Sequence, residues 1–323
     1  MSRRIVVTTG ARLHFGLLSN RAESGRNFGG AGLMIDSPGF QIAARHAEQD
    51  RITAHENYRC RIEDVIAAYR RHLRPEMQPS ACEIELIRPI PPHVGLGSGT
   101  QLAMAVAKSF ALLANDAQAD AATLAEKVGR GKRSSIGIHG FDRGGFLVDG
   151  GKLRGDVVGT DVARFDFPSD WRIVLVTPRN HAGLSGEREL DAFRRLPGML
   201  PETSERLRGL VQSELVPAVV GREFERFCEA LYNFGRIVGE YFAAVQGGVY
   251  ADATMTTLVQ ELRSAGVPGV GQTSWGPTIF ALAPSAEGAA SLAGDLETSP
   301  YCRDADVWIA TPRNTGAKVE IAG

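Results

Sequence analysis

The sequence predicts an α+β protein built as two lobes. The chain has 323 residues, which exceeds the ~100–200 residues of a typical single domain. Short runs with strand-like alternation are mixed with longer segments that show helical spacing. A turn-rich stretch at residues 150–168 lies near the middle of the chain. We therefore place a domain boundary there, with one lobe at residues 1–160 and the other at 161–323.

The composition excludes several classes of protein. Hydrophobic residues make up 43% of the chain and charged residues 23%, which is ordinary for a globular protein with a sizeable core. An intrinsically disordered chain and a disulfide-stapled miniature scaffold are therefore excluded. The formal net charge of -1 gives no global attraction to nucleic acid or to an anionic membrane. We expect neither as a partner.

The cysteines and the N-terminus indicate a cytoplasmic protein. The four cysteines stand alone and form no CxxC pair, so reduced thiols are expected rather than a zinc site. The first residues carry two arginines, but no long apolar segment or cleavage site follows them. No apolar run approaches the ~20 residues that span a bilayer.

The first half of the chain alternates between strand and helix patterns. Phe40, Ile42 and Ala44 alternate along the chain, as in a half-buried strand. Ile62 and Tyr69 share one face of a helix. We expect strands at residues 4–9, 12–18, 32–36, 39–46, 50–54 and 82–87, helices at 61–73, 100–114 and 119–128, and glycine-rich loops at 19–32, 89–99 and 129–145.

The second half continues the mixture of strands and helices. Phe227, Phe234 and Phe242 recur at helical spacing in the segment 222–245, and this stripe indicates a helix that faces the core. We expect strands at 145–149, 171–177, 278–283 and 305–310, and helices at 187–196, 202–216, 222–245, 254–265 and 285–296.

The most informative segment is the loop Pro91–Gln101, which joins an expected strand to an expected helix. Its three alternating glycines let backbone N–H groups approach an anion, and the helix N-terminus adds unpaired donors. Ser98 and Thr100 add hydroxyls that can bind phosphate or a metal, or cap the helix. The pattern matches neither a P-loop nor a dinucleotide-binding glycine motif. We expect anion binding, with a capped tight turn as the alternative. The residues expected to bind phosphate here are Gly95, Leu96, Gly97, Ser98, Gly99, Thr100 and Gln101.

This loop resembles the phosphate loop of the GHMP superfamily, named for galactokinase, homoserine kinase, mevalonate kinase and phosphomevalonate kinase. The usual loop reads P-x-x-x-G-L-G-S-S-A, and Gly99 and Thr100 replace its final Ser-Ala. Residues 9–14 and 270–278 fit the positions of a substrate-contacting first motif and a C-terminal glycine-rich motif. The resemblance implies a GHMP-kinase-like two-lobed α+β fold. Its N-terminal lobe would be mixed α/β and ribosomal-protein-S5-like, and its C-terminal lobe would be ferredoxin-like.

Two departures from that pattern argue against ordinary phosphorylation by ATP. GHMP kinases often carry G-[IMS]-x-D before a Gly-Gly strand, whereas here Gly137 and Ile138 are followed by His139. Asp142 is offset from the expected position by three residues. The C-terminal motif has lost most of its glycines and contains Trp275.

Five segments in the right order resemble the β-ribofuranosylaminobenzene 5'-phosphate synthase family. They are residues 10–18, 28–33, 94–101, 131–134 and 271–278. The resemblance implies condensation of 5-phosphoribosyl 1-diphosphate with 4-aminobenzoate or 4-hydroxybenzoate, in methanopterin biosynthesis. The reaction forms a C-riboside and releases CO2 and diphosphate. Those small molecules are the expected partners, and the sequence does not indicate which benzoate is preferred.

This chemistry gives roles to the basic residues. Lys132, Arg133 and Ser134 would bind phosphate, with a solvated basic turn as the alternative. Arg12 offers a planar fork for the carboxylate of the arene. Because that carboxylate leaves as CO2, no base is needed to remove a ring proton. We expect Mg²⁺ to assist the leaving diphosphate and no organic cofactor, and the sequence indicates no particular metal ligands.

The remaining site predictions come from the matched motifs. His139 would bind phosphate or polarise the ring substituent para to the reacting carbon, or it would be a loop histidine that bonds the backbone. His14 would face the cleft by strand alternation, or else face outward, and Asp142 is a further catalytic candidate. Trp275 would stack on the aromatic substrate or pack as a turn residue. The expected substrate-binding residues are Trp275, Ser274 and Gly30.

Two other functions stay open at this stage. One is an ATP- and Mg²⁺-dependent GHMP kinase, and the other is a catalytically silent ligand-binding member of the same fold. Turnover separates the silent protein from the two enzymes. A symmetric homodimer is the default expectation for the assembly.

Overall fold

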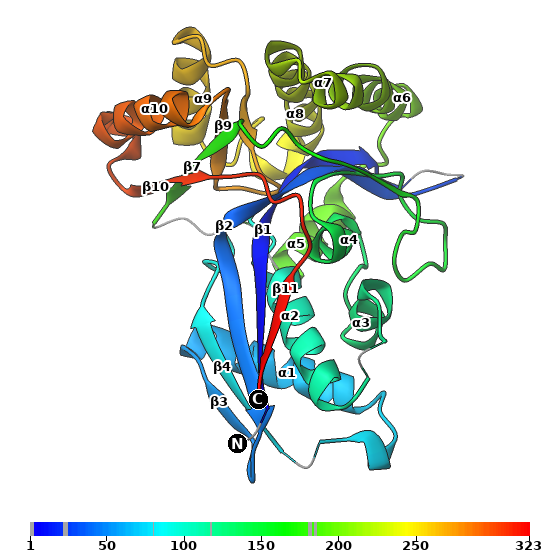
Figure 1. Ribbon diagram of the computed structural model, residues 1–323. Coiled ribbons are helices and arrows are strands. Elements are labelled where there is room, and N and C mark those ends of the chain that lie inside the picture. The colour runs from blue at the N-terminus through cyan, green and yellow to red at the C-terminus, as the bar shows by residue number, and fades with distance from the viewer. Residues whose placement is uncertain (1–2, 22–24, 80, 117, 180–182, 184–185) are drawn as a thin grey trace.

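The computed structural model describes residues 3–21, 25–79, 81–116, 118–179, 183 and 186–323. It shows the expected α+β arrangement of two lobes, each containing a β-sheet with helices packed on it (Figure 1). The first sheet has seven strands, and the second has four. Helices α6 to α10 lie at the opposite end of the molecule from the two termini. Of these, α8, α9 and α10 contact strands of the second sheet, whereas α6 and α7 contact β1 and β6 of the first sheet.

Two long antiparallel strands form the spine of the first sheet. β1 spans Arg4–Ser19 and β2 spans Phe28–His46, and they pair along most of their length. The sheet order is β11-β1-β2-β4-β3, while β5 pairs with β2 and β6 pairs with β5. The other strands are β3 Arg51–Thr53, β4 Cys82–Arg88, β5 Phe146–Asp149, β6 Val162–Phe165 and β11 Lys318–Ala322.

Helices cover one face of this sheet. The largely buried helix α2 contacts β1 and β2, and α1 packs against α2. Tyr69 of α1 and Phe110 of α2 are fully buried and meet edge to face, with ring centroids 5.6 Å apart. The helices of this lobe are α1 Glu56–Arg70, the 3-10 turn Pro75–Met77, α2 Ser98–Leu113, α3 Ala121–Lys127 and α4 Ile136–Arg143.

The second sheet has the antiparallel order β10-β7-β9-β8. The strands are β7 Arg172–Pro178, β8 Val270–Gln272, β9 Ile279–Ala283 and β10 Ala305–Ala310. The helical segments are α5 Gly186–Arg195, α6 Pro201–Leu210, the π-helical turn Val211–Leu215, α7 Val216–Gly221, α8 Phe224–Gln246, α9 Ala253–Ser264, α10 Ala286–Thr298 and the 3-10 turn Pro300–Cys302. The predicted phenylalanine stripe of α8 is confirmed as core.

Several expected boundaries were wrong. The sequence predicts two strands within each of β1 and β2, but each is one strand. Bulges between Gly10 and Ala11 and between His14 and Gly16 bend β1 without ending its pairing with β2. The expected loop at 129–145 contains helix α4, and strands β6 and β11 were not predicted.

Strands from both sides of residue 160 share the first sheet. β6 and β11 both come later in the sequence, yet they pair with β5 and β1. Arg4 lies opposite Ala322, so the two ends of the chain meet at one end of the first sheet (Figure 1). The division at residue 160 stays a prediction. Across the described residues, every helix is too short or too polar to cross a membrane.

Candidate functional site

The glycine loop adopts a backbone that its glycines make possible. Gly95 and Gly97 have φ angles of +84° and +71°, in the left-handed region that other residues avoid. A Cβ atom on Gly95 would lie 2.6 Å from the carbonyl oxygen of Thr273. Gly97 is the N-cap of α2, and among the described residues no side chain caps that helix. The first N–H groups of α2 therefore remain available to an anion.

Hydrogen bonds join this loop to β1 and to residues 273–277. The Arg12 N–H donates to the Leu96 carbonyl at 3.1 Å, and the His14 N–H donates to Thr273 Oγ1 at 2.9 Å. The Thr273 hydroxyl donates to the Gly95 carbonyl at 3.1 Å, and the Ser274 N–H donates to the His14 carbonyl at 2.9 Å. Three segments far apart in sequence are thus fixed around Arg12 and His14.

Three buried side-chain nitrogen atoms in this region lack hydrogen-bond partners among the described residues. Within the described part of the chain, Arg12 Nε, His14 Nε2 and Arg133 Nη1 contact no acceptor. Burial, and then the charges of Arg12 and Arg133, hold the pKa of His14 well below its usual value. Buried polar atoms are normally paired, so these three orphaned atoms indicate a place for a bound anion. We call Arg12, His14 and Arg133 the anion cluster.

Burial is the largest influence on the pKa values of Arg12 and His14. Burial lowers the pKa of Arg12 to about 10, Glu189 opposes this, and Arg133 adds to it. Arg12 therefore stays charged at neutral pH, but its charge is poorly solvated. A bound anion would relieve that cost.

Helix α5 covers Arg133. Arg133 Nη2 lies 2.8 Å from the Glu189 carboxylate, and its guanidinium carbon lies 5.0 Å from the ring centroid of Phe193. Phe193 in turn meets Trp275 at 90° and 5.3 Å. Glu189 is thus the carboxylate that balances the anion cluster in this structure.

A second group of bases lies beside the same loop. A Cβ on Gly97 would lie 3.2 Å from Arg12 Nε, whereas a Cβ on Gly99 would have Arg130 Nη1 as its neighbour, at 4.0 Å. Arg130 Nε is buried without a partner among the described residues, and burial and then Arg61 lower the pKa of Arg130. Arg61 of α1 reaches His93 Nε2 at 3.4 Å. The glycine loop therefore has positive charge on both flanks.

The two predicted catalytic residues of α4, His139 and Asp142, lie outside the anion cluster. His139 Nε2 is 2.7 Å from the Gly159 carbonyl, so this nitrogen carries a proton and donates it. The backbone-bonded alternative for His139 is thus the one that the structure shows. Asp142 is exposed near the C-terminal end of α4. It is the other end of this helix, at Gly137, that adjoins Thr100 and Arg12. The structure brings neither predicted catalytic group into the anion cluster.

A buried carboxylate supports the start of α4. Asp149 is 1% exposed and accepts the N–H groups of Ser135 at 2.8 Å and Gly151 at 2.9 Å. Burial raises its pKa despite these two bonds. The Ser135 hydroxyl accepts the Gly159 N–H at 2.7 Å. Asp149 therefore fixes the turn that follows Arg133.

Other predicted residues support the site from within the fold. Gln101 is fully buried, accepts the Thr9 hydroxyl and donates to the Gly137 carbonyl, so its side chain is not free for phosphate. Trp275 is 6% exposed and packs on Phe242 at 4.4 Å, so the alternative of a packed turn residue describes it. A Cβ on Gly30 would lie 3.2 Å from His14 Nε2.

The basic segment 130–134 is divided between interior and surface. Lys132 is exposed, while Arg133 belongs to the anion cluster and lies near His14. The Ser134 hydroxyl accepts the N–H of Ile136 at 3.3 Å. Sequence reasoning missed Glu189 and Arg61, because each lies in a helix whose charges are typical of a solvated face. Only the tertiary structure brings them to the loop.

The described residues provide no metal site made of protein ligands alone. Across the described residues, no group of three or more His, Cys, Asp and Glu side chains is arranged to hold a metal ion. The expected Mg²⁺ therefore has no identified protein ligands.

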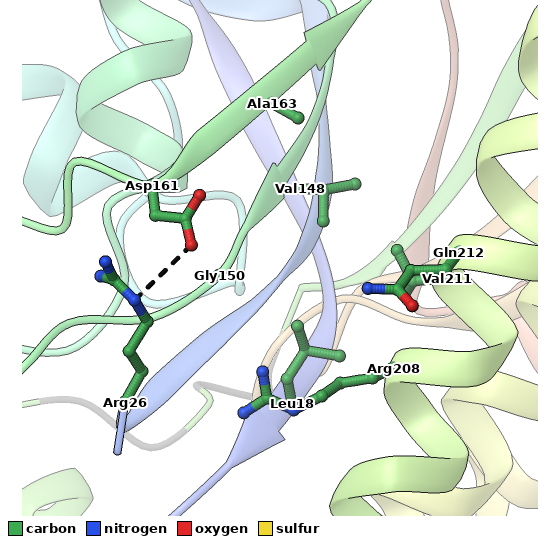
Figure 2. Close-up of a pocket in the computed structure, with 9 residues that line it drawn as sticks. All are labelled: Leu18, Arg26, Val148, Gly150, Asp161, Ala163, Arg208, Val211 and Gln212. Atoms are coloured by element: carbon green, nitrogen blue, oxygen red, sulfur yellow. Dashed lines mark ion pairs between the residues drawn. The ribbon is translucent and has the colours of Figure 1, made fainter.

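A separate pocket of about 210 Å³ lies between β5–β6 and the helices α6 and Val211–Leu215. Figure 2 shows Arg26 paired with Asp161 on one wall, and Arg208 and Gln212 on the other. Arg26 Nε lies 3.6 Å from the Asp161 carboxylate. Val148 of β5 lines it, whereas the neighbouring Leu147 packs with Ile136 of α4. Since successive side chains of a strand alternate, the pocket is on the face of β5 away from α4.

The chain resembles proteins of known sequence and structure. The family model for the GHMP kinases N terminal domain matches residues 61–147. A beta-ribofuranosylphenol 5'-phosphate synthase of Archaeoglobus fulgidus is 30% identical over 333 residues, covering 97% of this chain and 98% of that protein. The protein of the same name from Methanothermobacter thermautotrophicus is 29% identical, covering 86% and 88%. Among solved structures, a homoserine kinase from Cytophaga hutchinsonii has a TM-score of 0.69 at 19% identity over 98% and 97% of the two chains, which indicates a shared fold.

Proposed function

Since this chain belongs to the β-ribofuranosylphenol 5'-phosphate synthase family, we propose that it condenses 5-phosphoribosyl 1-diphosphate with a para-substituted benzoate. The products are a C-riboside 5'-phosphate, CO2 and diphosphate, within methanopterin biosynthesis. The observation that carries the assignment to this site is the anion cluster, whose three unpaired buried nitrogens belong to residues close enough to influence one another's charge, with Arg12 beside the glycine loop.

The reaction needs anion binding more than proton transfer. The ring carbon that bears the carboxylate attacks C1 of the ribose, while the C1–O bond breaks and its electron pair leaves with diphosphate. The C–C bond to the carboxylate then breaks, CO2 departs, and its electron pair restores the aromatic ring. Both substrates are anionic, so a site rich in buried cations suits them.

The two flanks of the glycine loop support separate roles. We assign the benzoate carboxylate to Arg12, because a guanidinium presents a planar fork to a carboxylate. The loop N–H groups and Arg130 are assigned to the diphosphate of 5-phosphoribosyl 1-diphosphate. Arg133 is assigned to a further anionic group of the two substrates. His14 replaces His139 as the imidazole that contacts substrate, because its Nε2 is unpaired within the described residues.

The names of the relatives favour one acceptor. Three of them are called beta-ribofuranosylphenol 5'-phosphate synthase, and a phenol product corresponds to 4-hydroxybenzoate. We therefore propose 4-hydroxybenzoate ahead of 4-aminobenzoate. Mg²⁺ remains part of the proposal as an ion carried by the substrate diphosphate, since Mg²⁺ often binds through phosphate oxygens. A homodimer is proposed as well, and light scattering tests it.

Diphosphate release tests the proposal and separates it from a kinase. Purified protein is incubated with 5-phosphoribosyl 1-diphosphate and Mg²⁺, with and without each benzoate, and phosphorus NMR follows diphosphate. We expect release that requires a benzoate and is faster with 4-hydroxybenzoate. A parallel arm contains ATP and homoserine. Phosphorylation there, with no benzoate-dependent diphosphate, would overturn the proposal in favour of a GHMP kinase.

A further inference from the structure

We propose that Glu189 holds the place of the substrate anion in the ligand-free protein and is displaced from Arg133 when that anion binds. This makes Glu189 a specificity-determining residue that excludes simple anions from the site. The inference rests on the proposed function, because it concerns the same anion cluster.

The contact between Glu189 and Arg133 occupies one terminal nitrogen of the guanidinium and leaves the other without a partner in the described structure. One Glu189 oxygen lies 2.8 Å from Arg133 Nη2, while Arg133 Nη1 is buried with no partner in the described structure. A carboxylate or phosphate can bind both nitrogens of a guanidinium at once. An incoming anion therefore has bonds to gain that Glu189 does not make.

The charges around Glu189 make its carboxylate and the substrate anion compete for the same arginines. Glu189 lies near Arg12 as well as Arg133, since its charge raises the pKa of Arg12 and its carboxylate lies 2.8 Å from Arg133 Nη2. An anion that entered while Glu189 remained would be repelled by it at close range. An anion that replaced it would face two arginines without that repulsion.

Displacement requires only rotation of one side chain. Glu189 is partly exposed, with 19% of its side-chain surface accessible, so solvent borders the pair. The helix itself is anchored by Ala192 and by Phe193, which packs on Phe242 and Trp275. Glu189 can therefore change rotamer while α5 stays in place.

Competition of this kind sets which ligands bind. A simple anion gains little by replacing a carboxylate that is already tethered to the protein. A substrate with an aromatic ring or a ribose gains further contacts, and these make displacement favourable. The expected consequence is weak binding of simple anions to the natural protein.

Calorimetry on Glu189→Gln tests the proposal. The probes are 4-hydroxybenzoate and inorganic diphosphate, titrated separately, so that the carboxylate and phosphate sources of the anion are distinguished. We expect at least one probe to bind about three- to tenfold more tightly to Glu189→Gln than to the natural protein. Glu187→Gln, an exposed position on the same helix, serves as the control and should leave both affinities unchanged.

Unchanged or weaker binding of both probes to a folded Glu189→Gln protein would overturn the proposal. Loss of packing or of Arg133 orientation predicts weaker binding, so a purely structural role cannot mimic the expected result. If Glu189→Gln does not fold, Glu189→Asp retracts the carboxylate by one methylene and should tighten binding by a smaller factor. No tightening in that variant would also overturn the proposal.

The outcome is independent of turnover. Tighter binding to Glu189→Gln in a protein that makes no riboside would uphold Glu189 as a competitor and refute the proposed function. Riboside formation by the natural protein, together with weaker anion binding by Glu189→Gln, would support the proposed function and refute Glu189 as a competitor.

Discussion

Arg12, His14 and Arg133 carry buried polar atoms that a folded protein normally pairs. Their positions follow from β1 and from the turn before α4, which Asp149 fixes. Alternation along β1 places Arg12 and His14 on one face, and this was predictable from the sequence. Glu189 was not predictable, because no local pattern separates it from an ordinary surface charge.

Replacement of Arg12 tests the carboxylate assignment. We expect Arg12→Gln to lower kcat/KM for the benzoate by about 100-fold, equivalent to about 2.7 kcal/mol. Arg12→Lys keeps the charge but loses the planar fork, so it should recover only part of that loss. Steady-state kinetics with varied benzoate provide the measurement. Arg51→Gln, an exposed change on β3, is the control, and an unchanged kcat/KM in Arg12→Gln would refute the assignment.

Burial of His14 predicts a pH-dependent stability. Burial, Arg12 and Arg133 depress its pKa when folded, whereas the unfolded chain titrates near pH 6.5. The unfolded state therefore binds more protons as the pH falls, and the free energy of unfolding decreases. His93, whose pKa is lowered by burial and then by Arg61, acts in the same direction.

We expect Tm to fall between about pH 7.5 and 5.5, and to fall less in His14→Gln. Thermal unfolding across that range measures both slopes. The exposed Arg51→Gln variant, which removes no group that titrates in this range, should keep the natural slope. Equal slopes in the natural protein and His14→Gln would show that His14 is not held neutral by its surroundings.

At the scale of elements, the glycine loop and helix α2 form one unit. The loop was predictable because its glycines, its hydroxyls and the following helix are contiguous in sequence. Its attachment to residues 273–277 depends on Thr273, which bonds both His14 and Gly95 across the fold. The contacts of His139 and Trp275 were harder to predict, because their partners, Gly159 and Phe242, are distant in sequence.

Two alanine variants separate the loop's conformation from its binding role. Gly97→Ala should lower the free energy of unfolding by about 1–2 kcal/mol, because residue 97 has a φ of +71° and its Cβ would crowd Arg12. Gly99 lies in the first turn of α2, and its added Cβ would make only an ordinary contact with Arg130 Nη1 at 4.0 Å, so Gly99→Ala should keep or slightly improve stability.

Both variants should raise KM for 5-phosphoribosyl 1-diphosphate, since an added methyl group obstructs a close anion. Denaturant unfolding and steady-state kinetics on the same preparations give the comparison. An unaltered KM in a stable Gly99→Ala protein would show that no phosphate approaches this turn.

At the scale of the whole molecule, the chain returns to its starting sheet. The last strand, β11, pairs with β1 over five residue pairs, from Arg4↔Ala322 to Thr8↔Lys318. β1 continues directly to Arg12 and His14, so the end of the chain supports the strand that carries the site. The two-lobed fold class was predictable from mixed periodicity, but this return was not, because strand pairing over such a distance leaves no local pattern.

Removal of β11 tests that support. A protein that ends at Ala317 should have a lower Tm and a lower kcat/KM, because the edge of β1 loses its hydrogen bonds. Differential scanning calorimetry and kinetics measure the two effects. A protein that lacks only Gly323, which lies beyond β11, is the control. Full stability and activity without β11 would contradict its supporting role.

The most direct test of the proposed function follows the carboxyl carbon of the acceptor. 4-Hydroxybenzoate labelled in its carboxyl group is incubated with the protein, Mg²⁺ and 5-phosphoribosyl 1-diphosphate, and the CO2 is trapped. We predict labelled CO2 that appears only when 5-phosphoribosyl 1-diphosphate is present, with one riboside formed for each CO2. A folded protein that binds both substrates yet releases no labelled CO2 from either benzoate would contradict the account.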